Sequence, residues 1–179
     1  MKIEILEELI EGDLIAPKTE LIFRRKILVR GRVEAWSVIA DGDLEVLGSL
    51  TIKDSLKVYG CARVKEDLSA GGNIEVEGRL EVDEELRGNW IEAGAGIKAK
   101  KIKAREGIIA GYGIEVLDSV ESGGPIQAGQ NIEGGELIKA GKGYKIFAGL
   151  TVHEDNLPEL GTINADKIEG EIGHGKRLR

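Results

Sequence analysis

The chain is poor in the residue types that build most enzyme sites and most large globular cores. Its 179 residues include one cysteine, two histidines, three prolines, two phenylalanines, two tryptophans and three tyrosines. The single cysteine, Cys61, excludes an intrachain disulfide and fits a reducing cytoplasm. So few aromatic side chains favour a thin core of stacked Ile, Leu, Val and Ala over a broad globular core.

Charge and hydropathy disfavour further classes of protein. The 32 acidic residues outnumber the 25 basic ones, for a net charge of −7, whereas a nucleic-acid surface needs clustered Lys and Arg. No apolar run reaches the length of a membrane span. The first residues, MKIEILEELIEGD, carry too many carboxylates for a secretory signal. We therefore expect a cytoplasmic protein with no nucleic-acid partner and no integral membrane segment.

The dominant positive feature is an aliphatic residue that recurs every six positions. Only two steps, Leu86 to Ile91 and Ile97 to Ile102, are five residues long. The recurring positions are Leu44, Leu50, Leu56, Ala62, Leu68, Ile74, Leu80, Leu86, Ile91, Ile97, Ile102, Ile108, Ile114, Val120, Ile126, Ile132, Ile138, Tyr144 and Leu150. A fixed short period is the signature of a solenoid.

Each repeat begins with an apolar, a polar and an apolar residue, as in Leu44-Glu45-Val46 and Ile74-Glu75-Val76. This alternation is typical of a short, half-buried β-strand. The next three positions are rich in Gly and Asp, and we expect glycine to permit the corners by adopting positive φ. The pattern predicts an all-β fold: a single-stranded parallel β-helix with triangular coils of about 18 residues.

Three sides per coil place every third repeat on one face. The polar positions of one such face are Glu45, Arg63, Glu81, Lys98, Glu115, Glu133 and Thr151. The first five alternate in sign, and opposite charges on neighbouring strands stabilise a ladder. This alternation supports the three-sided coil.

The periodicity divides the chain into three parts. Residues 1–13 are amphipathic and are expected to form a cap, with a short helix over the first coil. Residues 14–152 hold the β-helix. Residues 153–179 begin with a loop at Pro158, which cannot donate to a strand ladder. They continue with a last partial coil at Ile163-Asn164-Ala165 and Ile168-Glu169-Gly170, and they end in a basic tail.

Side chains suited to catalysis or metal binding are few and form no recognisable motif. The segment His153-Glu154-Asp155-Asn156 has metal-type side chains without the spacing of a zinc-protease helix. The Gly-x-Gly pairs at Gly94, Gly111 and Gly141 lack the third glycine of a dinucleotide loop and are interpreted as corners. We therefore expect no catalytic residue, no metal and no cofactor.

Two tryptophans, Trp36 and Trp90, are the candidate partner-binding residues. Each falls in a shortened, five-residue repeat, and counting sides places both on one face, three coils apart. An exposed aromatic side chain at a tight corner can anchor a partner, or it can simply cover the corner. Ile109, an apolar residue at an outward position, falls on a different face by the same count.

The segments GDLEVLGSLTI (residues 42–52) and GNIEVEGRLEV (residues 72–82) resemble bactofilins and the β-helical domain of FapA-type polymer-forming proteins. The resemblance covers most of residues 27–152. It implies a right-handed triangular β-helix that polymerises end to end without nucleotide, and a peripheral partner at the cell envelope. The chain departs from bactofilins in its N-terminal segment, which is not proline-rich, and in the interruption at residues 153–161, which is expected to obstruct one end.

The leading hypothesis is a non-catalytic scaffold whose partner is itself, as a homo-oligomer or polymer. One alternative is a trimeric hexapeptide-repeat acyltransferase, with His153 as its only catalytic candidate. In that family a small Ser, Thr, Ala or Val stands two residues before each aliphatic residue, a pattern that differs from the residues here: Gly48, Asp54, Gly60, Glu66 and Gly72. The other alternative is a binding module that presents one flat side with Trp36 and Trp90.

Overall fold

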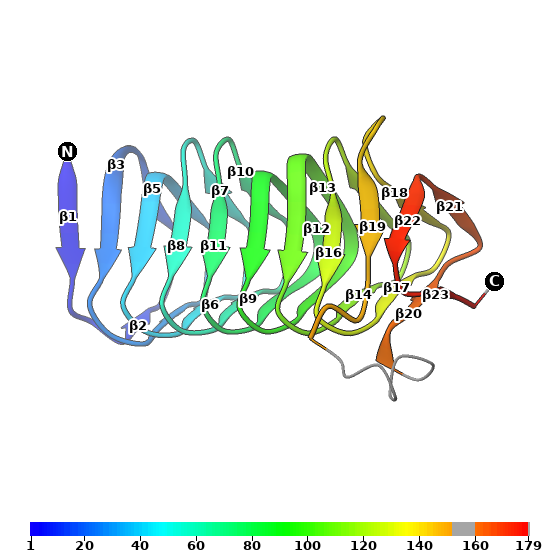
Figure 1. Ribbon diagram of the computed structural model, residues 1–179. Coiled ribbons are helices and arrows are strands. Elements are labelled where there is room, and N and C mark those ends of the chain that lie inside the picture. Colours follow the sequence, from blue (N-terminus) through cyan, green and yellow to red (C-terminus); the bar gives the residue numbers. More distant parts are fainter. Residues whose placement is uncertain (152–159, 179) are drawn as a thin grey trace.

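A computed structural model describes residues 1–151 and 160–178. The described chain forms a β-solenoid of about nine turns, with about 18 residues per turn, as the sequence period predicts. The two ends of the chain lie at opposite ends of the stack (Figure 1). No helix among the described residues is long and apolar enough to span a membrane.

The strands form three sides, here called A, B and C, which the chain visits in that order. Four long strands turn corners and serve more than one side: β3 (Leu14–Phe23), β5 (Val33–Ala40), β12 (Leu80–Ala93) and β13 (Ile97–Ala110). Side A also contains β1 (Lys2–Ile5), β8 (Leu56–Val58), β11 (Ile74–Val76), β16 (Ile126–Ala128), β19 (Lys145–Phe147) and β22 (Glu171–His174). Side B also contains β2 (Leu9–Ile10), β4 (Ile27–Val29), β6 (Leu44–Val46), β9 (Ala62–Val64), β14 (Ile114–Val116), β17 (Ile132–Gly134), β20 (Thr162–Asn164) and β23 (Lys176–Arg177). Side C also contains β7 (Leu50–Ile52), β10 (Leu68–Ala70), β15 (Ser119–Ser122), β18 (Leu137–Lys139) and β21 (Lys167–Glu169).

Every strand pairs in parallel with the strand one coil away on the same side. On side B, for example, Leu44 pairs with Ala62, and Ala62 with Leu80. In Figure 1 the strands of side A run downward at the front, and the chain then passes below and behind as it advances from the N-terminus. That sense of winding is right-handed, as expected.

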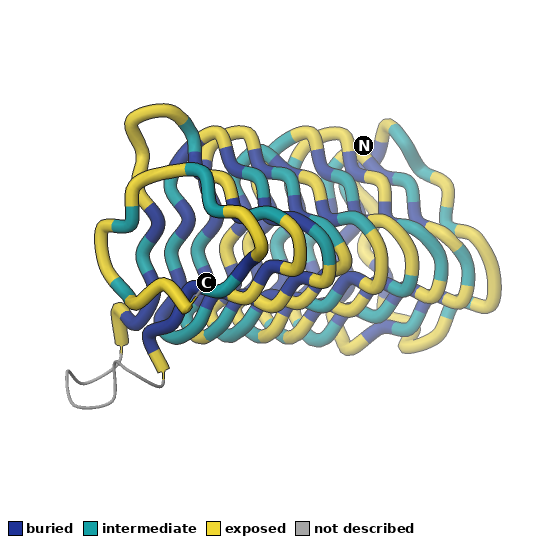
Figure 2. The backbone as a smooth tube through the Cα atoms, turned by 90° about the vertical axis from the view of Figure 1, so that its right-hand side faces the viewer, coloured by how far each residue is buried: buried dark blue, intermediate teal, exposed yellow. Residues whose placement is uncertain are grey.

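The core consists of aliphatic columns that run along the stack. The first and third residues of each strand point inward, and Leu44, Val46, Ile74 and Ile114 are all at most 1% exposed. Figure 2 shows the buried positions as stripes along the solenoid, with exposed residues at the corners. Neighbouring coils therefore cover each other's apolar side chains, which no single coil can bury alone.

Asp and Asn at the corners bind the next coil. In each case the side chain immediately before a strand accepts a hydrogen bond from the backbone N–H of the equivalent residue one coil further on. The bonds are Asp13 Oδ1 to Arg32 N (2.9 Å), Asp43 Oδ1 to Cys61 N (2.9 Å), Asp67 Oδ1 to Glu85 N (3.0 Å) and Asn131 Oδ1 to Thr162 N (3.0 Å). These bonds fix the vertical register of successive corners.

The corner glycines serve close packing between coils, and the expectation that they adopt positive φ is wrong for most of them. Among the described residues, positive φ occurs only at Gly143, Gly149, Gly170 and Gly175, all in the C-terminal quarter. Elsewhere the backbone of one coil lies directly over the next. A Cβ added at Gly111, for example, would collide with the carbonyl oxygen of Gly94.

The structure corrects three details of the sequence reading. Residues 2–5 and 9–10 form strands β1 and β2, which belong to a first coil in place of the expected short helix. Tyr144 and Leu150 are 52% and 50% exposed and do not lie in the core. A turn closed by the Tyr144 N–H and the Gly141 carbonyl lengthens this coil, so that Ile146 takes the inward place above Ile126.

Candidate functional site

The charged face predicted from the sequence runs along side B. The pairings bring Glu45, Arg63, Glu81, Lys98, Glu115 and Glu133 into one vertical ladder in that order. The place predicted for Thr151 belongs instead to Asn164, because β20 is the strand that follows β17 on this side. The ladder thus combines alternating charges with one repulsive step, from Glu115 to Glu133.

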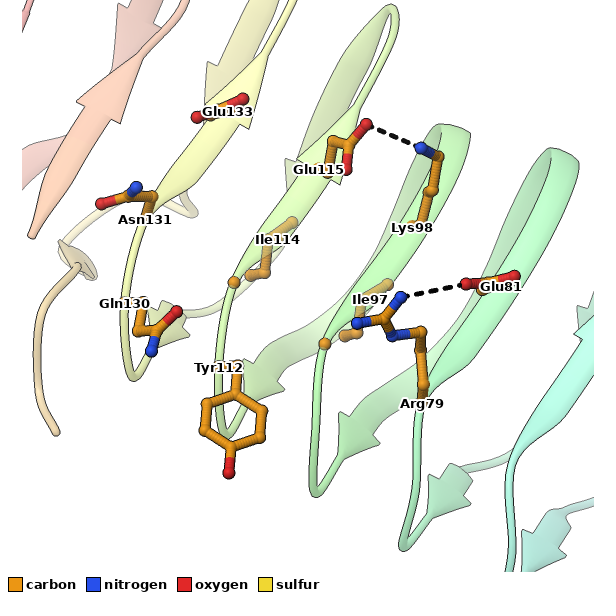
Figure 3. A pocket seen from close by; sticks show the side chains of 12 residues that line it. Arg79, Glu81, Ile97, Lys98, Tyr112, Ile114, Glu115, Gln130, Asn131 and Glu133 are labelled. Carbon is orange, nitrogen blue, oxygen red and sulfur yellow. Dashed lines mark hydrogen bonds and ion pairs between the residues drawn. The ribbon is translucent and has the colours of Figure 1, made fainter. Parts of the chain in front are cut away.

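Two shallow hollows of about 390 and 360 Å³ flank this ladder, one toward each neighbouring corner. Figure 3 shows the larger one, with Tyr112 and Gln130 at its rim and the ladder residues beside it. Lys98 donates to Glu115 at 2.8 Å, and Arg79 pairs with Glu81 at 3.3 Å. The hydrogen bond and charge of Glu115 raise the pKa of Lys98 above its ordinary value.

The ladder is arranged for electrostatic contact and lacks the features of an active site. Its cations are paired with carboxylates on neighbouring strands, and all of these side chains are at least partly exposed. Within residues 1–151 and 160–178, no group of three His, Cys, Asp or Glu side chains could hold a metal ion. A solvated surface of this kind can recognise a charged partner, but it offers no enclosed place for an acid–base reaction.

The structure places both tryptophans at the corner between sides C and A. Backbone hydrogen bonds connect Trp36 to Asp54, Asp54 to Gly72, and Gly72 to Asn89, the neighbour of Trp90, so three coils separate them. Trp36 is 50% exposed. Trp90 is half-buried because its ring lies over Gly107, and its Nε1 donates to Glu92 at 3.3 Å.

Ile109 does not lie on a different face from Trp90, so this part of the sequence count is wrong. Trp90 pairs with Gly107, and Glu92 pairs with Ile109, all on side A. Counting residues assigned Trp90 to side C, which ends at this corner. A residue that directly precedes an inward position belongs to the next side, so Trp90 lies on side A. Ile109 is half-buried and lies in the coil that follows Trp90, paired with Glu92.

The head of the solenoid, defined as the first coil (residues 1–16), carries a group of exposed large apolar side chains. The exposed large apolar side chains there are Met1 (89%), Ile3 (42%), Leu6 (62%), Leu9 (43%) and Ile15 (46%). In the described chain, β1, β2 and the first half of β3 pair only with strands of the second coil. Three strand edges, one per side, are therefore available at the head. Sequence reasoning missed this surface because it interpreted the same residues as a cap.

The tail of the solenoid, defined as β21, β22 and β23, also presents one strand edge per side. These strands pair only with β18, β19 and β20 in the described chain. Their charged residues include Lys167, Glu169, Glu171 and Lys176. His153, the residue on which the acyltransferase hypothesis depends, lies outside the described residues, so that hypothesis stays a prediction.

Comparisons with protein-family models, with curated proteins and with solved structures find no match to this chain. The functional argument therefore depends on the chain's own geometry.

Proposed function

We propose that this protein is a non-catalytic, bactofilin-like scaffold that associates with copies of itself through the ends of its β-solenoid. The observation that carries the proposal is the head: three strand edges without a partner among the described residues, surrounded by exposed Ile3, Leu6, Leu9 and Ile15. An unpaired parallel strand is a template for another strand. A second copy would satisfy the backbone groups and bury the apolar rim.

Two further observations support self-association over catalysis. The regular coils leave unpaired strand edges at both ends of the described stack. The hollows of side B are open, and the charged side chains that line them form ion pairs. The exposed thiol of Cys61 is compatible with a reducing compartment, so we place the scaffold in the cytoplasm. A peripheral partner at the cell envelope is part of the same proposal and comes from the bactofilin resemblance.

Sedimentation velocity over a range of protein concentrations tests the proposal with one variant and one control. Leu9→Lys places a charge on the edge of β2 at an exposed, outward position. Leu117→Lys is the matched control, because Leu117 is 67% exposed and lies in the middle of the stack. We expect wild type and Leu117→Lys to grow with concentration and Leu9→Lys to stop at smaller species. Equal growth of all three proteins would contradict association through the head.

A binding module is the second candidate function, and Trp36 is the residue that favours it. Its side chain is 50% exposed at a corner, which is unusual for a residue so rich in apolar surface. A partner anchored there would contact sides C and A near the head. Trp36→Ala should then abolish binding of a captured partner while leaving self-association unchanged.

A further inference from the structure

The register of side B places oppositely charged residues, whose side chains are exposed, at the backbone positions that continue its inward column at the two ends. Its members from Ile27 through Leu44 to Ile163 are buried aliphatic residues. At the head the column position belongs to Glu8, whose carbonyl accepts a hydrogen bond from Leu28 N at 2.9 Å. At the tail it belongs to Arg177, which pairs with Ile163. An aliphatic column that is acidic at one end and basic at the other is complementary to itself.

The neighbours of these two residues match in the same way. Glu7 precedes Glu8 at the head, and Lys176 precedes Arg177 at the tail. Leu9 and Leu178 follow at the outward position and are 43% and 51% exposed. The place of Leu178 is fixed by its N–H, which donates to the Ile163 carbonyl at 3.0 Å. Two acidic residues and one apolar residue at the head thus correspond, position by position, to two basic residues and one apolar residue at the tail.

We propose that copies of this chain stack head to tail, with Glu7-Glu8-Leu9 of one copy beside Lys176-Arg177-Leu178 of the next. The inference rests on the proposed self-association and adds the relative orientation of the copies. The new ladder would be parallel, like every ladder within the chain. Side A would contribute a second ladder, because Ile3 of β1 and Ile172 of β22 stand at the two ends of its inward column.

The alternative polarities place like charges together. A head-to-head contact brings Glu7 and Glu8 of both copies to one interface, and a tail-to-tail contact does the same for Lys176 and Arg177. Like charges on adjacent strands destabilise a ladder, whereas opposite charges stabilise it. The chain already uses this match between its first two coils, where Glu8 pairs with Arg25 at 3.5 Å and Glu11 with Arg30 at 3.0 Å.

The rise of the spiral limits the contact to two sides. When β1 pairs with β22 and β2 with β23, the first half of β3 lies two ladder spacings, roughly 9.6 Å, from β21. Side C therefore contributes no ladder. Arg177 also makes an interaction within its own chain. In the stack it would keep that interaction and also lie beside Glu8 of the next copy.

Cysteine cross-linking distinguishes head-to-tail contacts from head-to-head and tail-to-tail contacts directly. All variants carry Cys61→Ser, which removes the native thiol. Leu9→Cys and Leu178→Cys are then made on separate chains, at exposed positions that the fold does not use for its core. Adjacent residues of a parallel ladder lie roughly 4.8 Å apart, within the Cα range of a disulfide. Under a mild oxidant, the mixture of the two variants should give cross-linked dimer, whereas either variant alone should give no more than the Cys61→Ser background.

Each other outcome has a distinct meaning. Efficient dimers of Leu9→Cys alone would show head-to-head contact, and dimers of Leu178→Cys alone would show tail-to-tail contact. Either result overturns the inference. Absence of cross-links while the Cys61→Ser background still assembles also overturns it, and leaves the proposed function intact. A background protein that stays monomeric at every concentration refutes the proposed function itself.

Discussion

Gly107 lies directly under the indole ring of Trp90 in the preceding coil, with no room for a side chain between them. The ring also donates its Nε1 hydrogen to Glu92 at 3.3 Å. A methyl group at position 107 must displace the ring, because the Cβ would collide with it.

Gly107→Ala should therefore expose Trp90 and lengthen or break its hydrogen bond to Glu92. We expect red-shifted Trp90 emission, faster acrylamide quenching and a loss of about 1 kcal/mol in the free energy of unfolding. The measurement is tryptophan fluorescence in a Trp36→Phe background, so that Trp90 is the only tryptophan. Unchanged emission and quenching would mean that Trp90 does not cover Gly107.

Trp36 and Trp90 should be distinguishable in solution. Trp36 is 50% exposed, whereas Trp90 is half-buried against Gly107. The variant Trp90→Phe, which retains Trp36, should emit at longer wavelength and quench faster than Trp36→Phe, which retains Trp90. If Trp36 is fully shielded from quencher, its role as an exposed anchor is refuted.

Ile114→Asp should unfold the stack locally. Ile114 is 1% exposed in the inward column of side B, and an unpaired carboxylate there costs several kcal/mol, on the order of 3–5, unless it protonates. Ile114→Val is the matched control and should cost about 0.5–1.5 kcal/mol. Urea unfolding followed by circular dichroism measures both. An Ile114→Asp protein with the wild-type midpoint would contradict the assignment of inward and outward positions.

Glu85 should contribute a pH-dependent part of the stability. Arg87 donates to Glu85 Oε2 at 2.5 Å, and this hydrogen bond lowers the pKa of Glu85 below its ordinary value of 4.5. Because the pKa is lower in the folded state, the stabilisation is fully present above about pH 4.5. It is lost as the pH falls through the folded pKa.

Glu85→Gln should accordingly lose less stability than wild type when the pH is lowered from 7 to about 3. The control is Glu66→Gln, which removes a carboxylate at an exposed corner position one coil earlier and leaves the Glu85–Arg87 pair in place. Urea midpoints at several pH values provide the comparison. Parallel curves for wild type and Glu85→Gln would show that the Glu85–Arg87 pair does not stabilise the fold.

The middle of the fold could be predicted from the sequence, and the ends could not. From Leu44 to Ile138 a six-residue period with two five-residue steps determines which residues share a side, so the ladder from Glu45 to Glu133 follows by counting. The prediction was wrong at Tyr144, because added residues in a turn move the inward place to Ile146 without changing the local composition.

The head was misread for a different physical reason. Glu8 occupies a position that is aliphatic in every later coil of side B before the tail, so the first coil does not match the repeat pattern. Because carboxylates alternate with apolar residues in this segment, the sequence pattern predicted an amphipathic helix. Only the strand pairings reveal that Glu8 and Arg177 stand at the two ends of one column.

The most direct test of the central claim is light scattering behind size exclusion, over a range of protein and salt concentrations, with negative-stain microscopy of the largest fraction. Self-association through solenoid ends predicts a mass that grows with protein concentration and filaments one solenoid wide. High salt should weaken growth, because it screens the charges at the ends. A strict monomer, or a closed trimer whose mass does not change with concentration, would contradict the account.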